Sequence, residues 1–349
     1  MKKVITLITA LALCVGTLSG CGNSKTSPGG DKGSTTTPGG QTVTLKYDLT
    51  VSLEHPWGQA ATEFKTRLEE KSGGRFKVEI YPSSTSGSEA DSLAGMLVGT
   101  TSMTMSGGSF SGYAPSATLL EAPWAYNSEA DVQKMIEGDI GTSIKEDFEE
   151  AGFHVLWYQL RGPRQLTSNV AIHTPSDLTG RKMRMSGNPL HTSMWNTAGA
   201  VCSSIALSET FNALSQGVVE MQENPYDMIY DNSFFEVQKY VDETNHVYST
   251  ILNLISAELY NNLDDEMKGW LDETVTEMQD WVNSYYFEHK DDYRQKCIDA
   301  GMTINNDVDR AAFKDTMMPA IQTYLEDKGD GLWDMYQQIS ATSDANTKS

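Results

Sequence analysis

Three polar side chains in this sequence stand at the ends of short extended pieces, and each could bind an anion. Arg164 precedes one such piece, and Arg184 lies within another. Asn224 follows the apolar run 218–221. A guanidinium is planar and permanently charged, so it can make two parallel charge-assisted hydrogen bonds with a carboxylate. These residue types suit a carboxylate site, although their spacing alone leaves open that both arginines only cover apolar neighbours at the surface.

The segment 182–185 carries the clearest local pattern. Met183 and Met185 alternate with Lys182 and Arg184, which predicts a short strand with its thioethers turned toward a core and Arg184 on the opposite side. In open α/β sheets, ligands bind at the ends of strands. We therefore expect Arg184 to be presented at a binding site.

Several motifs follow one another in a fixed order around these residues. They are Gly162-Pro163-Arg164, Thr174 to Gly180, Lys182-Met183-Arg184, Ser208 to Leu214, and Gln222 to Pro225. Their order and spacing resemble the solute-binding proteins of tripartite ATP-independent periplasmic (TRAP) transporters, a family that includes binders of C4-dicarboxylates and sialic acid. The similarity extends from about Thr42 into the last helices. The resemblance implies an α/β fold of the periplasmic-binding-protein type, with two lobes, a ligand cleft between them and a long helix that crosses both.

The resemblance also implies roles for the polar residues. Arg184 would form the main salt bridge with a ligand carboxylate, and Arg164 would bind the same carboxylate or a second acidic group. Asn224 would fix the orientation of the ligand, because a carboxamide both donates and accepts. The chain departs from the family pattern at Ser186, 200–202 and 219–221, which leaves the identity of the ligand open more than its class.

Three further residues are candidates for ligand contact, each with a structural alternative. His55 lies on the loop after the first predicted strand, where it either touches ligand or holds the loop. Trp195 and Phe211 are candidate walls of the site, or core residues. Cys202 and Cys297 are predicted to be unpaired thiols, and no Cys/His spacing indicates a zinc site. We expect no metal and no cofactor.

Length and composition limit the number of lobes and the classes of ligand. The chain has 349 residues, 39% of them hydrophobic, and a formal net charge of −21. A chain of this length favours two lobes. An acidic surface excludes a nucleic-acid footprint, and it requires that any anion site be locally positive.

The first residues indicate export. Lys2 and Lys3 precede the apolar stretch 4–15, which is typical of a signal peptide and short for a permanent span. Leu18 to Cys21 resembles a bacterial lipoprotein cleavage box, so Cys21 is predicted to carry lipid, with a plain secretory leader as the alternative. The protein would then be anchored on the extracytoplasmic face of the cell membrane.

The expected organisation follows from these patterns. Residues 1–20 are the leader and 21–41 a flexible tether rich in Gly, Ser, Thr and Pro. Lobe I comprises 42–161 with 250–289, lobe II comprises 162–249 with 290–340, and 341–349 is a disordered tail. Parallel strands are expected at 43–51 and 76–80 around a helix, a return strand at 246–255, and helices at 132–148, 226–240, 264–299, 311–325 and 331–339. Ser208 is expected to cap a further helix that Gly217 ends.

These features favour a lipid-anchored protein that captures an organic anion, such as a C4-dicarboxylate or a sugar acid, for a TRAP transporter whose membrane subunits are its partners. A binding protein for an ATP-driven importer is the alternative, because it would use the same hinged lobes. An extracytoplasmic hydrolase is less favoured, since the chain contains neither Gly-x-Ser-x-Gly nor His-Glu-x-x-His. We therefore expect a protein that is not an enzyme.

Overall fold

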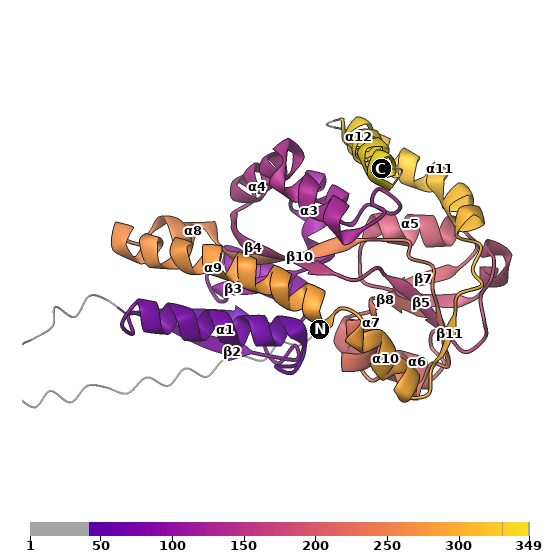
Figure 1. The fold of residues 1–349 in the computed structure, drawn as a ribbon, viewed down its shortest axis with the longest axis horizontal. Coiled ribbons are helices and arrows are strands. Elements are labelled where there is room, and N and C mark those ends of the chain that lie inside the picture. Colours follow the sequence, from indigo (N-terminus) through magenta and orange to yellow (C-terminus); the bar gives the residue numbers. More distant parts are fainter. Residues whose placement is uncertain (1–41, 330, 348–349) are drawn as a thin grey trace, which may run out of the picture. The chain divides into compact units, whose positions relative to one another are not determined.

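A computed structural model of the protein describes residues 42–329 and 331–347. The predicted leader, Cys21 and the tether lie outside the described residues. The largest sheet of the described part has the strand order β2-β1-β3-β10-β4 (Figure 1). Its strands are β1 (Val43–Asp48), β2 (Phe76–Tyr81), β3 (Met103–Ser106), β4 (Phe153–Arg161) and β10 (Ser249–Ser256). β1 runs parallel to β2, as expected, and also to β3, whereas β10 is antiparallel to β3 and β4.

Helices cover this first sheet. They are α1 (Pro56–Lys71), α2 (Glu89–Leu97), α3 (Glu129–Glu137), α4 (Asp139–Glu150), α8 (Ala257–Asn261) and α9 (Asp265–His289). α1 and α9 lie side by side (Figure 1) and share a buried hydrophobic cluster with the sheet. The Asp264 carboxylate caps α9 by accepting from the Met267 amide at 2.8 Å. Gln279 then ties the helix to β4 by donating to the Tyr158 carbonyl at 2.9 Å.

Two smaller sheets form the second half of the molecule. One has the order β11-β9-β5-β8, and the other pairs β6 with β7. The strands are β5 (Gln165–Ser168), β6 (Lys182–Met185), β7 (Val201–Ser204), β8 (Gln222–Asn224), β9 (Tyr240–Asp242) and β11 (Thr303–Asn305). A bridge between Met183 and Met221 joins them. The surrounding helices are α5 (Pro189–Thr197), α6 (Leu207–Ser215), α7 (Tyr226–Asp231), α10 (Asp292–Asp299), α11 (Arg310–Lys328) and α12 (Leu332–Thr347).

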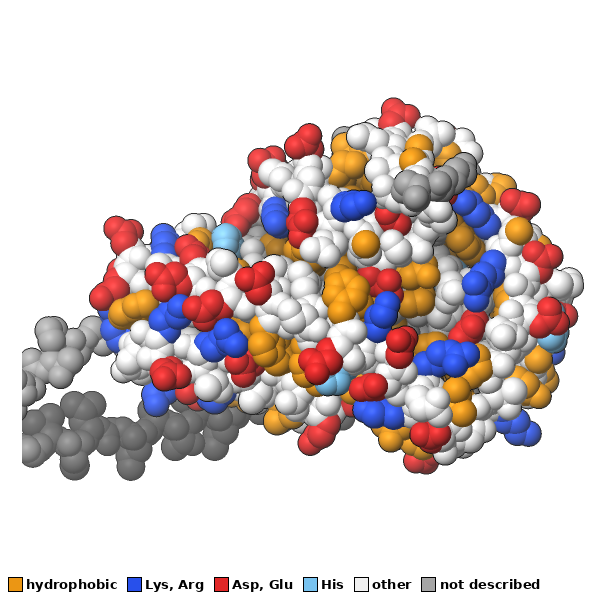
Figure 2. Space-filling view, viewed as in Figure 1, with side chains coloured by type: hydrophobic (Ala, Val, Ile, Leu, Met, Phe, Trp, Pro, Cys, Tyr) orange, Lys and Arg blue, Asp and Glu red, His pale blue; other side chains and the backbone are white. Residues whose placement is uncertain are grey.

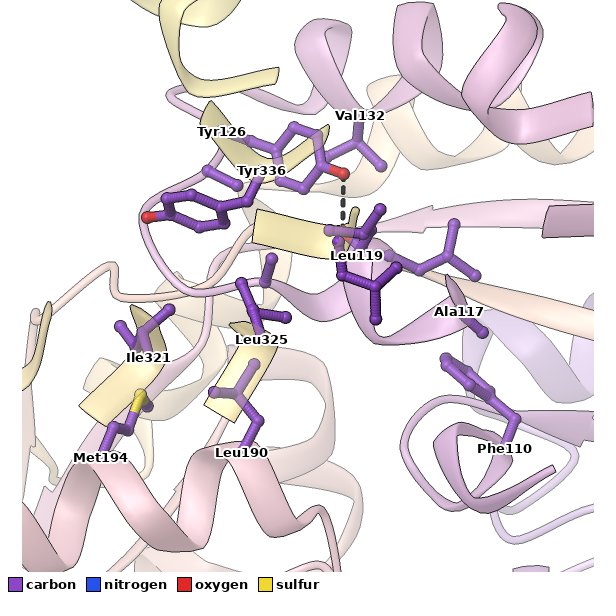
Figure 3. Close-up of a cluster of buried hydrophobic side chains, with 14 of the residues drawn as sticks. Phe110, Ala117, Leu119, Tyr126, Val132, Leu190, Met194, Ile321, Leu325 and Tyr336 are labelled. Atoms are coloured by element: carbon purple, nitrogen blue, oxygen red, sulfur yellow. Dashed lines mark hydrogen bonds between the residues drawn. The ribbon is translucent and has the colours of Figure 1, made fainter. Parts of the chain in front are cut away.

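One hydrophobic cluster continues from the first sheet into the second half. It includes Leu252 of β10, Leu190 and Met194 of α5, and Ile321 and Leu325 of α11. Figure 3 shows these α5 and α11 side chains facing one another, with the Tyr126 hydroxyl donating to the Leu119 carbonyl nearby at 2.6 Å. Because the cluster contains residues from both sheets, the two halves share packed contacts as well as the strands that connect them.

The long helix expected at 264–299 is two helices. α9 ends at His289 and α10 begins at Asp292. Lys290 and Asp291 keep right-handed helical backbone angles, and neither is a Gly or Pro, so the local sequence does not mark the break. The direction changes because the two helices pack on different partners: α9 packs on α1 and β4, whereas α10 packs on α7.

The tail expected to be disordered from Ala341 is helical, because α12 runs to Thr347. Ser343 is buried there and donates to Asp131 at 2.8 Å. The last turns of α12 are thus held by tertiary hydrogen bonds to Asp131 and to the Asn127 amide.

Three other helix boundaries differ from the prediction. The helix expected at 132–148 divides at Gly138 into α3 and α4. α7 ends at Asp231, and the chain later forms β9 instead of continuing as a helix to Tyr240. Ala206, not Ser208, precedes α6 as its N-cap residue. Gly138 is a local signal for the first break. The second helix ends early because β9 pairs with β5 and β11 where the helix was expected to continue.

Both cysteines of the described residues are free, as predicted: Cys297 is buried and Cys202 is half-buried. Among the residues described, no helix combines the length and apolar character that a membrane span requires.

Candidate functional site

A cavity of about 370 Å³ lies between the first sheet and the two smaller ones. Glu89, Gly107 and Ile251 line it from the side of the first sheet, and Arg164, Arg184 and Asn224 line it from the other side. The structure thus brings together the three polar residues that the sequence predicted as a site. We call this space the arginine cavity.

Arg184 is held by its position on β6. Met183 and Met185 are fully buried on the opposite face of the strand, so the alternation of a strand turns Arg184 toward the cavity. Its Nε donates to the Ile205 carbonyl at 2.8 Å. Its two terminal nitrogens make no hydrogen bond or ion pair with any described residue. Burial lowers the pKa of Arg184 to about 10, so the side chain remains a cation at neutral pH.

Arg164 is in a different state, because a buried carboxylate already pairs with it. Its Nη2 donates to Glu223 Oε1 at 2.7 Å, and its Nε donates to the other carboxylate oxygen. Burial would raise the pKa of Glu223, but the charge of Arg164 and hydrogen bonds from Arg164 and His246 hold it far below its usual range. Arg164 therefore organises the site, with only Nη1 lacking a partner among the described side chains.

His246 completes this pair from the far side. Its Nε2 lies 3.2 Å from Glu223 Oε2, and its Nδ1 lies 2.8 Å from the Thr244 hydroxyl. Burial lowers the pKa of His246, so we take the ring as neutral and as a donor to Glu223.

Asn224 lies next to Glu223 on β8. Its Oδ1 accepts from Arg164 Nη2 at 3.3 Å, and its Nδ2 donates to Gln222 Oε1 at 2.6 Å. The carboxamide is thus oriented by its neighbours before any ligand binds.

A third arginine, Arg161, also lines the cavity. Its Nη1 lies 3.4 Å from Glu121 Oε1, and its guanidinium sits 5.1 Å from the centre of the Trp57 ring. A Cβ on Gly107 would come within 2.2 Å of Ile251 Cδ1 and 2.9 Å of Nη1, so a larger residue there would require both side chains to shift. Burial lowers the pKa of Arg161 to about 10.

The backbone amides of the glycine-serine loop 106–109 surround the carboxylate of Glu89. Its Oε1 accepts from Gly107, Gly108 and Ser109 at 3.1, 3.3 and 3.0 Å. Glu89 also lies near enough to Arg184 to favour its charged form. The loop therefore fixes an acid in the wall of the cavity.

Sequence reasoning missed Arg161, Glu121 and Glu89 as parts of the site. Arg161 stands three residues before Arg164, at the end of β4, and that short spacing was the one available signal. The sequence contains no comparable signal for Glu121 and Glu89. Glu121 ends a 3-10 helix and Glu89 begins α2, and both are distant in sequence from the arginines.

The other three predicted contacts lie outside the lining of the arginine cavity. His55 is buried as the N-cap residue of α1, where its Nδ1 accepts from the Trp57 amide at 3.1 Å. Trp195 is fully buried in the core and packs against His246 and Phe313. Phe211 packs at the edge of another hydrophobic cluster. In this structure His55 therefore holds the start of α1, and Trp195 and Phe211 pack in hydrophobic clusters. Within the described residues, no group of His, Cys, Asp and Glu could hold a metal ion.

Comparisons with known proteins agree with this architecture. Residues 49–328 match the family described as bacterial extracellular solute-binding protein, family 7. The solute-binding protein RD1_1052 of Roseobacter denitrificans is 35% identical over 282 residues, which are 80% of this chain and 86% of the relative. The 2,3-diketo-L-gulonate-binding periplasmic protein YiaO of Escherichia coli is 30% identical over 279 residues, 78% of this chain and 84% of that protein.

Solved structures show the same fold. The crystal structure of a TRAP periplasmic solute-binding protein from Roseobacter denitrificans with bound L-galactonate superposes with a TM-score of 0.82. It is 33% identical and the match covers 86% of this chain and 99% of that one. The crystal structure of a TRAP periplasmic solute-binding protein from Polaromonas, bound to D-erythronate, has a TM-score of 0.80 at 25% identity over 86% of this chain and 99% of that one. The chain therefore belongs to the bacterial extracellular solute-binding protein family 7 and is a solute-binding protein of the TRAP type.

Proposed function

We propose that this protein captures a monocarboxylate rich in hydroxyl groups, a sugar acid, outside the cytoplasm. The observation that carries this proposal is the unequal pairing of three buried arginines. Arg164 pairs with Glu223 and Arg161 with Glu121, whereas Arg184 has no carboxylate partner among the described residues. A buried charge without a partner is costly, so a ligand carboxylate that pairs with Arg184 is strongly favoured.

The same pairing limits the number of acidic groups on the ligand. Among the described residues that line the cavity, two arginines are already paired with acids and one cation is free, and Glu89 adds a carboxylate. A second carboxylate on the ligand would meet this acid, and like charges in a water-poor site repel strongly. A hydroxyl group, in contrast, can donate a hydrogen bond to Glu89. A dicarboxylate is therefore the less suitable ligand.

The remaining lining offers partners for hydroxyl groups. Besides Ser88, which caps α2, the cavity is lined by serines whose hydroxyls make no hydrogen bond to another described residue: Ser84, Ser109, Ser186, Ser204 and Ser208. Two of the similar proteins support the assignment by what they bind, namely L-galactonate and 2,3-diketo-L-gulonate, which each carry one carboxylate on a hydroxylated chain.

Capture would proceed by closure of two lobes, 42–161 with 250–289 and 162–249 with 290–340. Residues of both proposed lobes line the cavity, and polar contacts such as Ser52 Oγ to Asp231 Oδ1 at 2.6 Å join them. Closure would exclude water and strengthen each charged contact. The ligand would leave unchanged, delivered to the membrane subunits of a TRAP transporter.

A binding screen tests the ligand class. Purified protein is titrated with L-galactonate, D-galacturonate, succinate and butyrate, and unfolding temperature and calorimetric affinity are measured. We expect the sugar acids to raise the unfolding temperature, because saturation at about 100 times Kd adds about 2.7 kcal/mol. Tighter binding of succinate than of both sugar acids would overturn the monocarboxylate assignment. No binding by any of the four would overturn capture of organic acids of these classes.

We also propose that Cys21 anchors the protein to the outer face of the cell membrane through lipid, as the lipoprotein box in the sequence suggests. Metabolic labelling with an alkyne fatty acid tests this separately. We expect label on the wild type and none on Cys21→Ser, with release of that variant from the membrane fraction; unlabelled wild-type protein would leave a plain secretory leader as the explanation.

A further inference from the structure

A second cavity of about 260 Å³ lies beside the arginine cavity and shares Trp57 with it. Its walls come from the end of α9, from α7 and α10, and from the segment 159–165 that links the two sheets. We call it the aromatic cavity. Figure 2 shows the face that carries the end of α9, where the surface is hollowed and hydrophobic, acidic and basic side chains meet. The proposed capture of a sugar acid makes no use of this space.

Aromatic rings dominate the lining. They are Trp57, Tyr226, Trp281, Tyr285, Tyr286 and Tyr293. Trp281, Tyr285 and His289 follow one another along one side of α9 with stacked rings, at centroid distances of 4.9 and 4.2 Å. Aromatic faces carry the negative part of the ring quadrupole, so a cation close to them is stabilised.

The charged side chains of this lining have the opposite balance from those of the arginine cavity. Glu129, Asp227, Glu243 and Asp291 are acids, against Lys290 and Arg294 as bases. Arg294 already pairs with Glu243 at 2.9 Å. Lys290 lies over the Phe287 ring. A cation in the cavity would therefore find acids that the bases of the lining do not neutralise.

Glu129 is the acid best placed to meet a ligand. The Tyr286 hydroxyl donates to its Oε1 at 2.9 Å, which links the carboxylate to one of the lining rings. No base pairs with Glu129 among the described residues. Asp227, in contrast, has His55 Nε2 at 3.5 Å and the Met228 amide at 2.8 Å.

We propose that the aromatic cavity binds a small organic cation, such as a quaternary ammonium compound, with its charged group against the tyrosine rings and near Glu129. The rings supply cation–π contact, and the net negative lining disfavours the anions that the arginine cavity attracts. The proposal does not depend on the function proposed above.

Two probes of the same shape test it. Choline and 3,3-dimethylbutan-1-ol differ in that a carbon replaces the charged nitrogen. Binding to the full mature protein is measured by calorimetry and by the tyrosine signals in NMR. We expect choline to bind at least about fivefold more tightly than the alcohol, because the cation–π contribution is about 1 kcal/mol. Equal affinities, or no binding of choline at about 50 mM, would overturn the proposal, since an affinity weaker than that is not specific recognition.

Variants locate the site. Glu129→Gln keeps the size of the side chain and an acceptor for Tyr286. Trp281→Leu removes a ring of the lining; it is preferred to a change at Tyr293, because Lys296 already lies 4.0 Å from the centre of that ring. Each is expected to weaken choline binding several-fold. Asp280→Asn removes one charge from α9, outside the cavity lining, and is expected to have no effect. Choline affinity unchanged by both cavity variants, or reduced as much by Asp280→Asn, would contradict the assignment. Arg184→Gln should leave choline binding intact even where sugar-acid binding is lost.

Discussion

The two cavities that share Trp57 differ in how the charged side chains of their linings are paired. Among the described residues, the arginine cavity carries three guanidinium groups, two of them paired with glutamates, so we expect recognition of an anion to rest on the third, Arg184. The aromatic cavity carries rings and acids, of which Glu129, Asp227 and Glu243 are half-buried. A buried cation without a partner raises the free energy of the empty arginine cavity, so this cavity should select for anions. The empty aromatic cavity has a lower cost in free energy, and it should bind its cation weakly.

The comparison also separates two roles for a buried arginine within one cavity. Arg164 and Arg184 are both buried to the same degree, at 3% exposure. We expect Arg164 to contribute to the stability of the site, because it has an internal partner, and Arg184 to contribute to ligand binding, because it has no carboxylate partner among the described residues. Substitutions that remove single charges can test this distinction directly.

The largest effect is expected from Glu223→Gln. This change leaves Arg164 buried without its carboxylate, and breaking such a pair costs about 3–5 kcal/mol. Urea unfolding of the wild type and the variant measures the loss. Glu129→Gln, the same change in the aromatic cavity, is the matched control and should alter the free energy of unfolding by less than about 0.5 kcal/mol. Similar losses in both variants would remove the contrast between the cavities.

Arg184→Gln should come next, with its main effect on binding. We expect a loss of at least about 100-fold in sugar-acid affinity, since truncating one partner of a buried charge pair costs about 2–5 kcal/mol. Stability without ligand should be unchanged or slightly higher, because an unpaired buried charge is removed. Calorimetry and urea unfolding together check both halves of this prediction; a large loss of stability would show that Arg184 has a structural partner.

Much of this arrangement could be predicted from the sequence, and the exceptions have a common cause. The alternation of Met183 and Met185 predicted the strand that presents Arg184, because side-chain direction in a strand is a local property. The roles of Arg161, Glu89 and Glu223 depend on which distant segment each one meets. A local pattern cannot reveal whether an arginine is already paired, so the sequence predicted ligand contact for both Arg164 and Arg184.

The same limit explains the errors in the helices. The break between α9 and α10 has no local signal at Lys290 and Asp291, since it results from packing on different partners. For His55 the local sequence allows two roles. A residue before Pro56 can lie on a loop near a ligand or can be the N-cap residue of a helix, and only the folded chain distinguishes these roles.

The dependence of stability on acid pH should also report on the pair formed by Glu223 and Arg164. The folded protein holds the pKa of Glu223 below the value of an unfolded glutamate, about 4.3. A depressed folded pKa contributes stability that is present above the unfolded pKa and is lost as pH falls through the folded value. We expect the wild type to lose stability from about pH 5 downward. Thermal unfolding at a series of pH values should show a shallower slope for Glu223→Gln, and equal slopes would assign the acid sensitivity to other groups.

The smallest effect is expected from a change at Trp57, which lines both cavities. Trp57→Phe keeps an apolar ring but weakens its contact with the Arg161 guanidinium, which is worth about 0.5–1 kcal/mol. We therefore expect sugar-acid and choline affinities to fall by about two- to fivefold each. Calorimetric titrations with both probes check this, and a change confined to one probe would show that Trp57 serves one cavity alone.

The place of β10 in the first sheet bears on how the chain acquires its structure. β10 lies between β3 and β4 and hydrogen-bonds to both, yet it follows β4 by almost ninety residues of chain. During synthesis, the N-terminal segment therefore has two unfinished sheet edges until about three quarters of the polypeptide has emerged. Pairings so distant in sequence form slowly, which would keep a newly made chain extended long enough to be threaded through an export channel before it folds.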